Sequence, residues 1–177
     1  MRIRPATGQR DLDLCCKLDH SFETDQVYQM DSWDHSGTIQ VTFRRIRLPR
    51  EVEVSYPLQG DALRASWQYL DGFLVAVDQS GINGYFSFRT EPEHSLVSGC
   101  DLVVDRSSRR QGIGSALLWA AEQWSRERGF RRLVIGGQTK NDPFVQFCRA
   151  CGLSFCGYND HYWPSQDIAL FFGKTLR

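Results

Sequence analysis

The chain has 177 residues, and its 21 lysines and arginines balance 21 aspartates and glutamates, so the formal net charge is zero. This length predicts a single domain, residues 1–177, with a hydrophobic core of its own. The balanced charge argues against a nucleic-acid-binding protein, and the lack of a long apolar run argues against a membrane protein. The N-terminus has no apolar stretch typical of secretory signals, so the six cysteines are expected to be reduced thiols of a cytoplasmic protein.

The first fifty residues are expected to contain two strands and one short helix. A strand at residues 1–5 and a helix at 11–18 come first. Residues 20–31 are polar and aromatic and are expected to form a loop over a cleft. β-branched and aromatic residues predict a strand at 38–46, and Pro49 is expected to end it because proline has no N–H for a strand ladder.

A hairpin is the clearest element in the middle of the chain. Its strands are expected at residues 73–77 and 84–88, joined by a polar, glycine-containing turn at 78–83. Residues 51–57, which precede it, alternate polar and apolar positions and fit either a strand or a loop. The hairpin is followed by another expected strand at 95–104.

The C-terminal half alternates strands and helices. One helix is expected at 113–128, because apolar residues recur on one face and Gly129 follows as a stop signal. A second helix is expected to begin after Asn141, where an N-cap residue precedes a proline in the first turn, and to end at Gly152. Three further strands are expected, at residues 132–137, 153–158 and 168–174.

The most informative stretch lies where the strand at 95–104 ends. The apolar run Leu102-Val103-Val104 leads into a polar turn with Arg109 and Arg110, and then into Gly112-Ile113-Gly114-Ser115 at the start of a helix. Glycines let the backbone approach an anion closely, and the free N–H groups and the dipole of a helix N-terminus attract it. The pattern therefore predicts a pyrophosphate site.

Two widespread phosphate-binding motifs do not fit this stretch. No Gly-Lys-Ser/Thr follows at the spacing of a P-loop, and Leu117 stands where a dinucleotide-binding fingerprint needs its third glycine. The segment instead resembles the R/Q-x-x-G-x-G/A loop of the GNAT superfamily of N-acetyltransferases, here Arg109-x-x-Gly112-x-Gly114.

The second motif of that superfamily, N-x-x-A-x-x-F-Y-x-x-x-G-F, is matched in part. Asn141, Phe147 and Gly152 agree with it. Three positions depart from it, with Phe144 for the small residue, Cys148 for the tyrosine and Leu153 for the final aromatic.

This resemblance implies an α/β (α+β) architecture, the GNAT fold, with a mixed twisted sheet of about six to seven strands, flanked by helices and splayed after the fourth strand. It also implies acetyl-CoA as the co-substrate, with its diphosphate held by the glycine loop. The backbone edge of the preceding strand is expected to pair with the pantetheine amides. The expected cofactor-binding residues are Leu102, Val103, Val104, Arg109, Arg110, Gln111, Gly112, Ile113, Gly114, Ser115, Asn141 and Phe147.

Within the superfamily the chain is most similar to the streptothricin acetyltransferases. The similarity rests on Glu53-Val54-Ser55-Tyr56, on Asp101-Leu102-Val103-Val104, and on the tail that begins Tyr162-Trp163-Pro164-Ser165. It implies transfer of an acetyl group to a primary amine of a small molecule such as a streptothricin-like antibiotic. Two alternatives stay open, a protein or peptide N-acetyltransferase and a non-catalytic acyl-CoA-binding sensor. A homodimer is also expected, because superfamily members are often dimers.

Amine acetylation needs a neutral amine and a proton for the departing thiolate. Asp101 precedes the cofactor-binding run, where the resemblance places an acidic residue that faces the acceptor, so it is the expected general base, with His94 as an alternative. The expected contacts of a cationic acceptor are Glu23, Asp25, Glu53 and Tyr56.

Cys148 stands where the family tyrosine protonates the departing thiolate. A thiol has an ordinary pKa close to that of a CoA thiol, so proton exchange is thermodynamically feasible, although the side chain is short. Cys148 is therefore one candidate for the general acid, and Tyr158, Tyr162 or water are the others.

A metal site competes with this interpretation. The spacing Cys148-x2-Cys151-x4-Cys156-x4-His161 is close to that of a zinc knuckle, with the third and fourth ligand types exchanged. Two of the cysteines fall on an apolar helical face and the third in a predicted strand, whereas a knuckle needs a tight turn between its first two ligands. No metal is expected.

Overall fold

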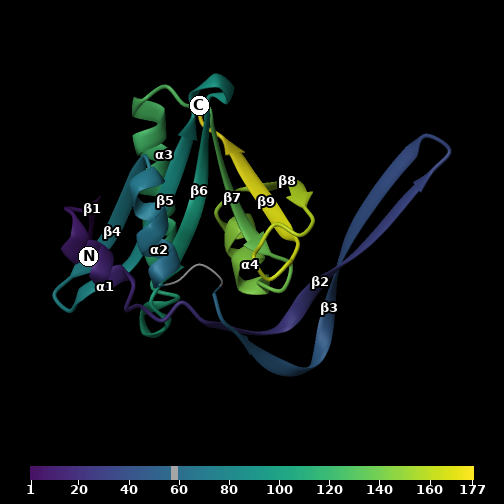
Figure 1. Cartoon of the computed structure of the whole chain (residues 1–177), viewed down its shortest axis with the longest axis horizontal. Helices are drawn as coiled ribbons and strands as arrows, with labels where there is room; N and C mark the ends of the chain where they lie inside the picture. The colour runs from purple at the N-terminus through teal and green to yellow at the C-terminus, as the bar shows by residue number, and fades with distance from the viewer. Residues whose placement is uncertain (57–59) are drawn as a thin grey trace.

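The computed structural model describes residues 1–56 and 60–177. Its body is a seven-stranded mixed sheet in the order β1-β4-β5-β6-β7-β9-β8, which confirms the predicted α/β fold (Figure 1). Neighbouring strands run antiparallel except β6 and β7, which are parallel. The strands are β1 (Arg2–Pro5), β4 (Gly72–Asp78), β5 (Gly81–Glu91), β6 (Leu96–Val104), β7 (Arg132–Gln138), β8 (Ser154–Asn159) and β9 (Ala169–Thr175).

Each face of the sheet carries its own hydrophobic cluster, because side chains alternate along a strand. Leu74 and Phe86 belong to one cluster, and their neighbours Phe73 and Tyr85 belong to the other. The first cluster includes residues of α3 and α4, and the second includes residues of α1 and α2. The α-helices are α1 (Gln9–Cys15), α2 (Asp61–Ser66), α3 (Ile113–Glu127) and α4 (Asp142–Ala150), with short 3-10 turns η1 (Trp67–Tyr69), η2 (Pro92–His94) and η3 (Arg106–Ser108).

Most predicted elements of the body are confirmed with small shifts of their ends. The predicted hairpin is β4–β5, and α3 ends just before Gly129, whose φ of 80° is left-handed. Helix α2 was not predicted, since only Leu63 of its residues is fully buried and no apolar period marks it. Of the segment 51–57, residues up to Val54 belong to a strand, and Pro57 lies outside the described residues. Among the described residues no helix has the length and apolar character needed to span a membrane.

The sheet splays open between its fourth and fifth strands. The last residue pair that joins β6 to β7 is Gly99 with Ile135. On its other side β6 pairs with β5, where Ser87 faces Asp101 and Phe88 faces Gly99, so Cys100 is an extra residue, a β-bulge. Because a bulge bends its strand, β6 turns away from β7 just beyond Gly99. The predicted splay is thus confirmed and has a local cause.

The region expected to be a loop over a cleft is instead a strand. β2 (Phe22–His35) and β3 (Thr38–Val54) pair with each other in a separate two-stranded ribbon, which leaves the body as a long arm (Figure 1). The loop prediction for 20–31 is therefore wrong. Within β2 only Phe22, Thr24 and Tyr28 are buried, and none of them is aliphatic, so composition alone does not separate this strand from a loop.

Pro49 does not end β3, which continues to Val54. Thr24 pairs with Val52 and Gln26 pairs with Arg47, so residues 48–51 bulge out opposite a single residue of β2. Within a bulge the ladder requires no N–H from Pro49, and the proline is tolerated there.

Candidate active site

A cavity of about 650 Å³ opens where β6 and β7 separate. The second half of β6 forms one wall, β7 from Ile135 to Gln138 forms the other, and the starts of α3 and α4 close it. Of the predicted cofactor-binding residues, all but Gln111 line this cavity: Leu102, Val103, Val104, Arg109, Arg110, Gly112, Ile113, Gly114, Ser115, Asn141 and Phe147.

The N-terminus of α3 has the two glycines that the sequence pattern singled out, and each is needed for a different reason. Gly112 is the N-cap and has a left-handed φ of 81°, while a Cβ on it would meet nothing within 4 Å. A Cβ on Gly114 would lie 3.2 Å from the ring of Phe147 in α4. The first N–H groups of a helix have no intrahelical acceptor, so they are donors for an anion at this end of the cavity.

Arg109 holds the shape of this loop through its own hydrogen bonds. Its Nε donates to the carbonyl oxygen of Val104 at 3.0 Å, and its Nη2 donates to that of Asp19 at 3.1 Å. These bonds tie the loop to the end of β6 and to the segment before β2. The neighbouring Arg110 is exposed, has a left-handed φ of 64°, and places its charge at the cavity.

Asp101 is a buried carboxylate in the wall that β6 forms. Its Oδ1 accepts a hydrogen bond from the Tyr56 hydroxyl at 2.8 Å, and its Oδ2 accepts one from the Ser87 hydroxyl at 2.9 Å. The backbone N–H of Asp101 returns a bond to Ser87 Oγ at 3.1 Å. Both carboxylate oxygens are therefore oriented by donors from β5 and from the segment after β3.

Burial raises the pKa of Asp101 above its ordinary value, and the hydrogen bonds from Tyr56 and Ser87 offset this only in part. Burial also raises the pKa of the Tyr56 hydroxyl well above its ordinary value, so the tyrosine keeps its proton and donates it. Among the described residues, Arg89 is the positive charge that lowers the pKa of Asp101, and it forms no ion pair with it. A buried carboxylate with raised proton affinity in a cavity is typical of a general base.

Three residues that sequence reasoning missed also line the cavity, namely His20, Gln138 and Trp163. Each is buried and has a polar atom without a partner in the described structure: His20 Nδ1, Gln138 Oε1 and Trp163 Nε1. The amide of Gln138 is oriented, since its Nε2 donates to Asp167 Oδ2 at 2.6 Å. Buried polar atoms are rarely unpaired, and three of the four unpaired side-chain atoms found in the described residues belong to residues that line this cavity, the fourth being the Tyr85 hydroxyl, so they favour a binding site here.

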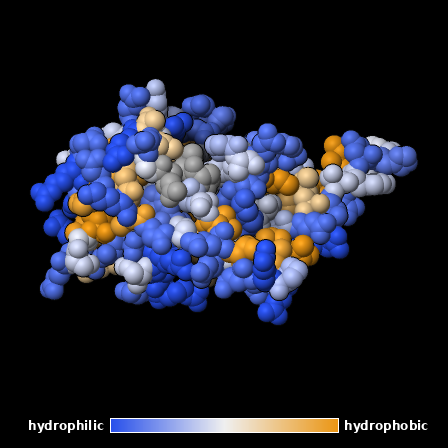
Figure 2. Space-filling model, turned by 60° about the horizontal axis from the view of Figure 1, so that its bottom comes forward, coloured by the Kyte–Doolittle hydropathy of each residue, from blue (hydrophilic) through white to orange (hydrophobic). Residues whose placement is uncertain are grey.

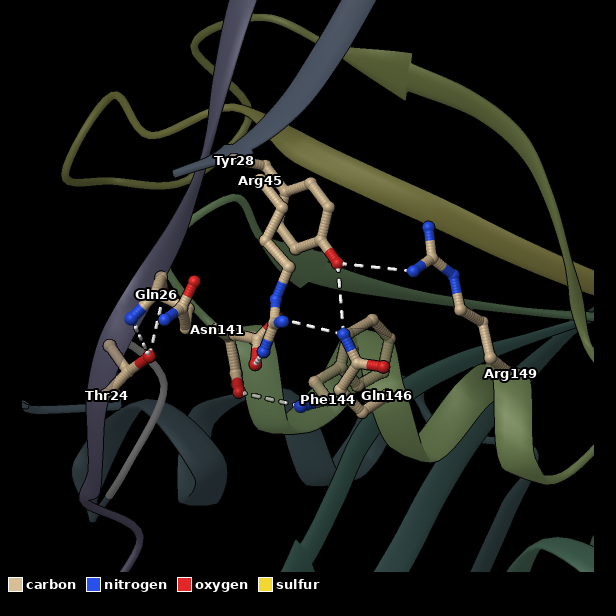
Figure 3. Close-up of polar contacts among 9 residues, drawn as sticks. Thr24, Gln26, Tyr28, Arg45, Asn141, Phe144, Gln146 and Arg149 are labelled. Carbon is tan, nitrogen blue, oxygen red and sulfur yellow. Dashed lines mark hydrogen bonds and ion pairs between the residues drawn. The ribbon is translucent and has the colours of Figure 1, made fainter. Parts of the chain in front are cut away.

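Helix α4 both closes the cavity and carries a cap. Asn141 Oδ1 accepts the N–H of Phe144 at 3.0 Å, as Figure 3 shows, and Asn141 also lines the cavity. Both expectations for Asn141, capping and contact with the cofactor arm, are therefore compatible with its position. Phe144 packs where Gly137 of β7 has no side chain, because a Cβ there would lie 2.2 Å from the Phe144 ring.

The same helix anchors the arm to the body (Figure 3). Arg45 of β3 donates to both oxygens of Asp142 at 2.7 Å, and the hydroxyl of Tyr28 in β2 accepts from Gln146 Nε2 at 3.2 Å. Arg149 Nη1 donates to the same hydroxyl at 3.4 Å. The base of the arm is thus fixed beside the cavity.

The three side-chain candidates for the general acid, Cys148, Tyr158 and Tyr162, lie elsewhere. Cys148 is fully buried in the core on α4, where burial raises its pKa far above its ordinary value. Tyr158 lies on β8 at the edge of the sheet, and its ring packs on Phe43 of the arm at a centroid distance of 5.3 Å. Tyr162 is half-exposed and packs on Trp163 and Phe171. None of the three residues lines the cavity, so the structure does not bring them to the expected cofactor site.

The acidic residues expected to bind a cationic acceptor already have partners. Glu23 and Glu53 face each other across the ribbon, and Arg106 lies 2.5 Å from the first and 3.5 Å from the second. Asp25 pairs with Arg47 at 3.0 Å. Of the four expected acceptor contacts, only Tyr56 lines the cavity.

Comparison with known proteins agrees with this geometry. The model of the acetyltransferase (GNAT) family matches residues 25–153. No curated protein sequence matches the chain.

Solved structures share the fold. Nourseothricin acetyltransferase is 22% identical and aligns over 99% of this chain and 98% of its own, with a TM-score of 0.83. A protein from Bacillus anthracis str. Ames, assigned as a streptothricin acetyltransferase and solved with acetyl coenzyme A, is 20% identical over 98% of both chains, with a TM-score of 0.74. An aminoglycoside 6'-N-acetyltransferase solved with coenzyme A is 17% identical over 67% of this chain and 82% of its own, with a TM-score of 0.58.

Proposed function

Because the chain belongs to the acetyltransferase (GNAT) family, we propose that it transfers an acetyl group directly from acetyl-CoA to a primary amine of a small molecule. The observation that carries this proposal is one cavity that joins the N-terminus of α3 to the buried carboxylate of Asp101. An anion-binding end and a base in the same cavity serve the two needs of such a reaction, which are to hold the donor and to activate the acceptor.

The residues present fit acetyl-CoA, the donor that the family uses. The diphosphate would be held by the free N–H groups from Gly112 to Ser115 and by the charge of Arg110. Beyond Gly99, β6 has no strand partner on the side of β7 in the described structure, so its backbone groups there are available to the pantetheine amides. When bound, acetyl-CoA supplies the activated thioester.

Asp101 takes the proton of the acceptor amine in this proposal. Tyr56 and Ser87 each use one lone pair of its carboxylate, and a carboxylate has about four, so an amine N–H still finds an acceptor there. The negative charge in a poorly solvated cavity also attracts the ammonium form of the acceptor. The raised pKa of Asp101 improves it as a base.

The departing thiolate needs no dedicated acid from the protein. A free thiol has a pKa of about 8.5, so its thiolate is a stable leaving group near neutral pH and takes up its proton from water. A dedicated acid is therefore not needed, which explains why the tyrosine of the family pattern can be replaced here by Cys148, whose thiol is buried in the core.

We place a streptothricin-like antibiotic first among the acceptors. Support comes from the likeness to nourseothricin and streptothricin acetyltransferase structures, and from the unpartnered groups of Gln138 and Trp163. An amide oxygen and an indole N–H suit a polar acceptor that has both donors and acceptors near its amine. Six free thiols fit the reducing cytoplasm in which we place the reaction.

The test is mass-spectrometric detection of acetylated product after incubation with acetyl-CoA and streptothricin, aminoglycosides, polyamines or short peptides. We expect a mass gain of one acetyl group on streptothricin, and a far slower gain with the matched Asp101→Asn variant. A gain on peptides alone would identify a protein acetyltransferase. Binding of acetyl-CoA with no product on any amine would identify a sensor. Product on peptides alone and binding without product would each contradict the proposal.

A further inference from the structure

The arm formed by β2 and β3 reaches well beyond the body. Residues 31 to 40 are all exposed, and the aromatic contacts of the arm with the body end at Phe43, which packs on Phe155 and Tyr158 of β8. Ser36 and Gly37, both with positive φ, form the tight turn at its tip. Figure 2 shows the arm as a thin extension, with apolar residues on it and beside the point where it leaves the body.

An isolated two-stranded ribbon in water is marginally stable at best. The outer part of this arm has regular pairing from Asp31 with Thr42 to His35 with Thr38, yet it gains no cover from its own body. Regular pairing without cover indicates that another surface packs on it in the working protein.

The two faces of the arm differ. Opposed residues share a face, so Met30 with Phe43, Ser32 with Val41 and Asp34 with Ile39 lie on the same side. This side has an apolar row of Phe43, Val41 and Ile39, and Ile39 is 77% exposed. The other side of the outer arm is polar apart from Trp33, with Gln29, Asp31, Thr38, Gln40, Thr42 and Arg44.

The apolar row continues onto the body. Phe43 meets Phe155 and Tyr158, which are still 51% and 39% exposed. They belong to β8, the last strand of the sheet, whose outer edge has no strand partner in the described structure. An open sheet edge is usually covered in native proteins. One chain therefore presents both a projecting apolar arm and an uncovered apolar edge.

We propose that the arm is a dimerisation arm, in which the Ile39–Val41 face of each copy packs on the Phe155–Tyr158 edge of the other. When a two-fold axis relates two copies, the arm of each copy packs on the β8 edge of the other. The contact is then made twice, and both apolar surfaces of each chain are covered. A second copy covers both surfaces at once, whereas an unrelated partner on the arm leaves β8 open.

The charges support a second copy. Asp34, at the arm tip on the apolar side, has no ion pair in the described structure, and neither has Arg149 of α4 at the arm base. A two-fold arrangement that carries each tip toward the base of the other arm brings these opposite charges together at two symmetric places.

The test is the mass of the full chain by sedimentation equilibrium over a range of concentrations. We expect a dimer for the wild type, and for an Ile39→Lys, Val41→Lys variant an association at least about 100-fold weaker, because two charges are then buried in an apolar contact. The matched control is Thr38→Lys, Gln40→Lys, which adds the same charge to the same strand on the opposite face and is expected to stay a dimer. Acetyl-CoA binding checks the fold of each variant, since none of the four residues lines the cavity.

A wild type that is monomeric at every concentration overturns the proposal. This holds even if a macromolecular acceptor is later found to cover the arm. A dimer that persists in the Ile39→Lys, Val41→Lys variant places the interface elsewhere and overturns it too. Loss of the dimer only in the control variant assigns the wrong face. None of these results bears on the acetyl transfer, which is measured separately.

Discussion

The Tyr56 hydroxyl donates to Asp101 Oδ1 at 2.8 Å and joins two residues that lie 45 positions apart in the chain. Tyr56 follows the return strand of the arm, and Asp101 follows the bulged Cys100 that opens the sheet. The bond therefore connects the arm's return to the point where β6 and β7 separate. It also lowers the pKa of Asp101 against the larger opposite effect of burial, because a hydrogen bond donated to a carboxylate favours its charged form.

Replacing Asp101 removes the proposed base without changing the shape of the cavity. An Asp101→Asn variant keeps acceptor capacity for Tyr56 but cannot take a proton, so we expect kcat to fall by about 10²–10⁴-fold. Acetyl-CoA binding, measured by calorimetry, is expected to stay within a few-fold of wild type. A variant with unchanged kcat would remove Asp101 from the mechanism.

Replacing Tyr56 shifts the pH dependence of the reaction. Burial already raises the pKa of Asp101, and the bond from Tyr56 lowers it, so Tyr56→Phe raises that pKa further. Because the base must be ionised, activity on the acid side is then lost at a higher pH than in the wild type. The measurement is kcat/KM against pH, with Tyr158→Phe as the control, since that tyrosine lies outside the cavity. An acid limb that stays in place or moves to lower pH contradicts this role.

The two glycines of the phosphate loop are expected to respond differently to a methyl group. At Gly112 the left-handed φ makes Gly112→Ala cost about 1–2 kcal/mol of unfolding free energy, although the space is open. Gly112→Asn is the control, because asparagine tolerates that conformation and is expected to lose less unfolding free energy.

At Gly114 the methyl group displaces the Phe147 ring, so Gly114→Ala is expected to raise KM for acetyl-CoA by about tenfold. Urea unfolding and steady-state kinetics separate the two effects, and equal stability losses at both positions would refute the assignment.

The parts of the site that could be predicted from the sequence consist of residues that are close together in the sequence. The loop from Arg109 to Ser115 has its whole signal within a few residues, since a helix start and its glycines are neighbours. His20, Gln138 and Trp163 come together only through the fold, and no spacing between them announces a site. The arm was mistaken for a loop because the buried positions of its first strand, Phe22, Thr24 and Tyr28, include no aliphatic residue, and its outer part is exposed on both faces, so the apolar alternation typical of a buried strand is weak.

Cys148 occupies the position of the family tyrosine, but its surroundings in this chain differ from the family pattern. The family pattern has a small residue three positions before the aromatic at Phe147, and this chain has Phe144 there, packed over Gly137. The thiol lies in the core, so we expect Cys148→Ala to keep kcat within about twofold while the free energy of unfolding falls by about 1–2 kcal/mol from lost packing. Steady-state kinetics beside a thermal melt decide it. A large drop in kcat with unchanged stability would restore Cys148 as an acid.

Two unpartnered polar groups line the acceptor side of the cavity. The expected effect of replacing them depends on whether the substrate forms hydrogen bonds with them. Trp163 Nε1 and Gln138 Oε1 are buried without partners in the described structure. If no ligand bonds them, Trp163→Phe relieves a desolvation cost and is neutral or stabilising, Gln138→Leu loses its bond to Asp167, and the kinetics of both variants are unchanged. If the acceptor bonds them, each change raises KM for the amine by about tenfold, which corresponds to one lost hydrogen bond, and leaves KM for acetyl-CoA unchanged.

We expect the second result, because both side chains line the cavity while Gln138 is held in one orientation by Asp167. Asp167→Asn is the matched control. It keeps the side chain's size but allows the Gln138 amide to turn, so a smaller rise of the same KM is expected. A rise in KM for acetyl-CoA instead of the amine would assign Gln138 to the donor half of the cavity.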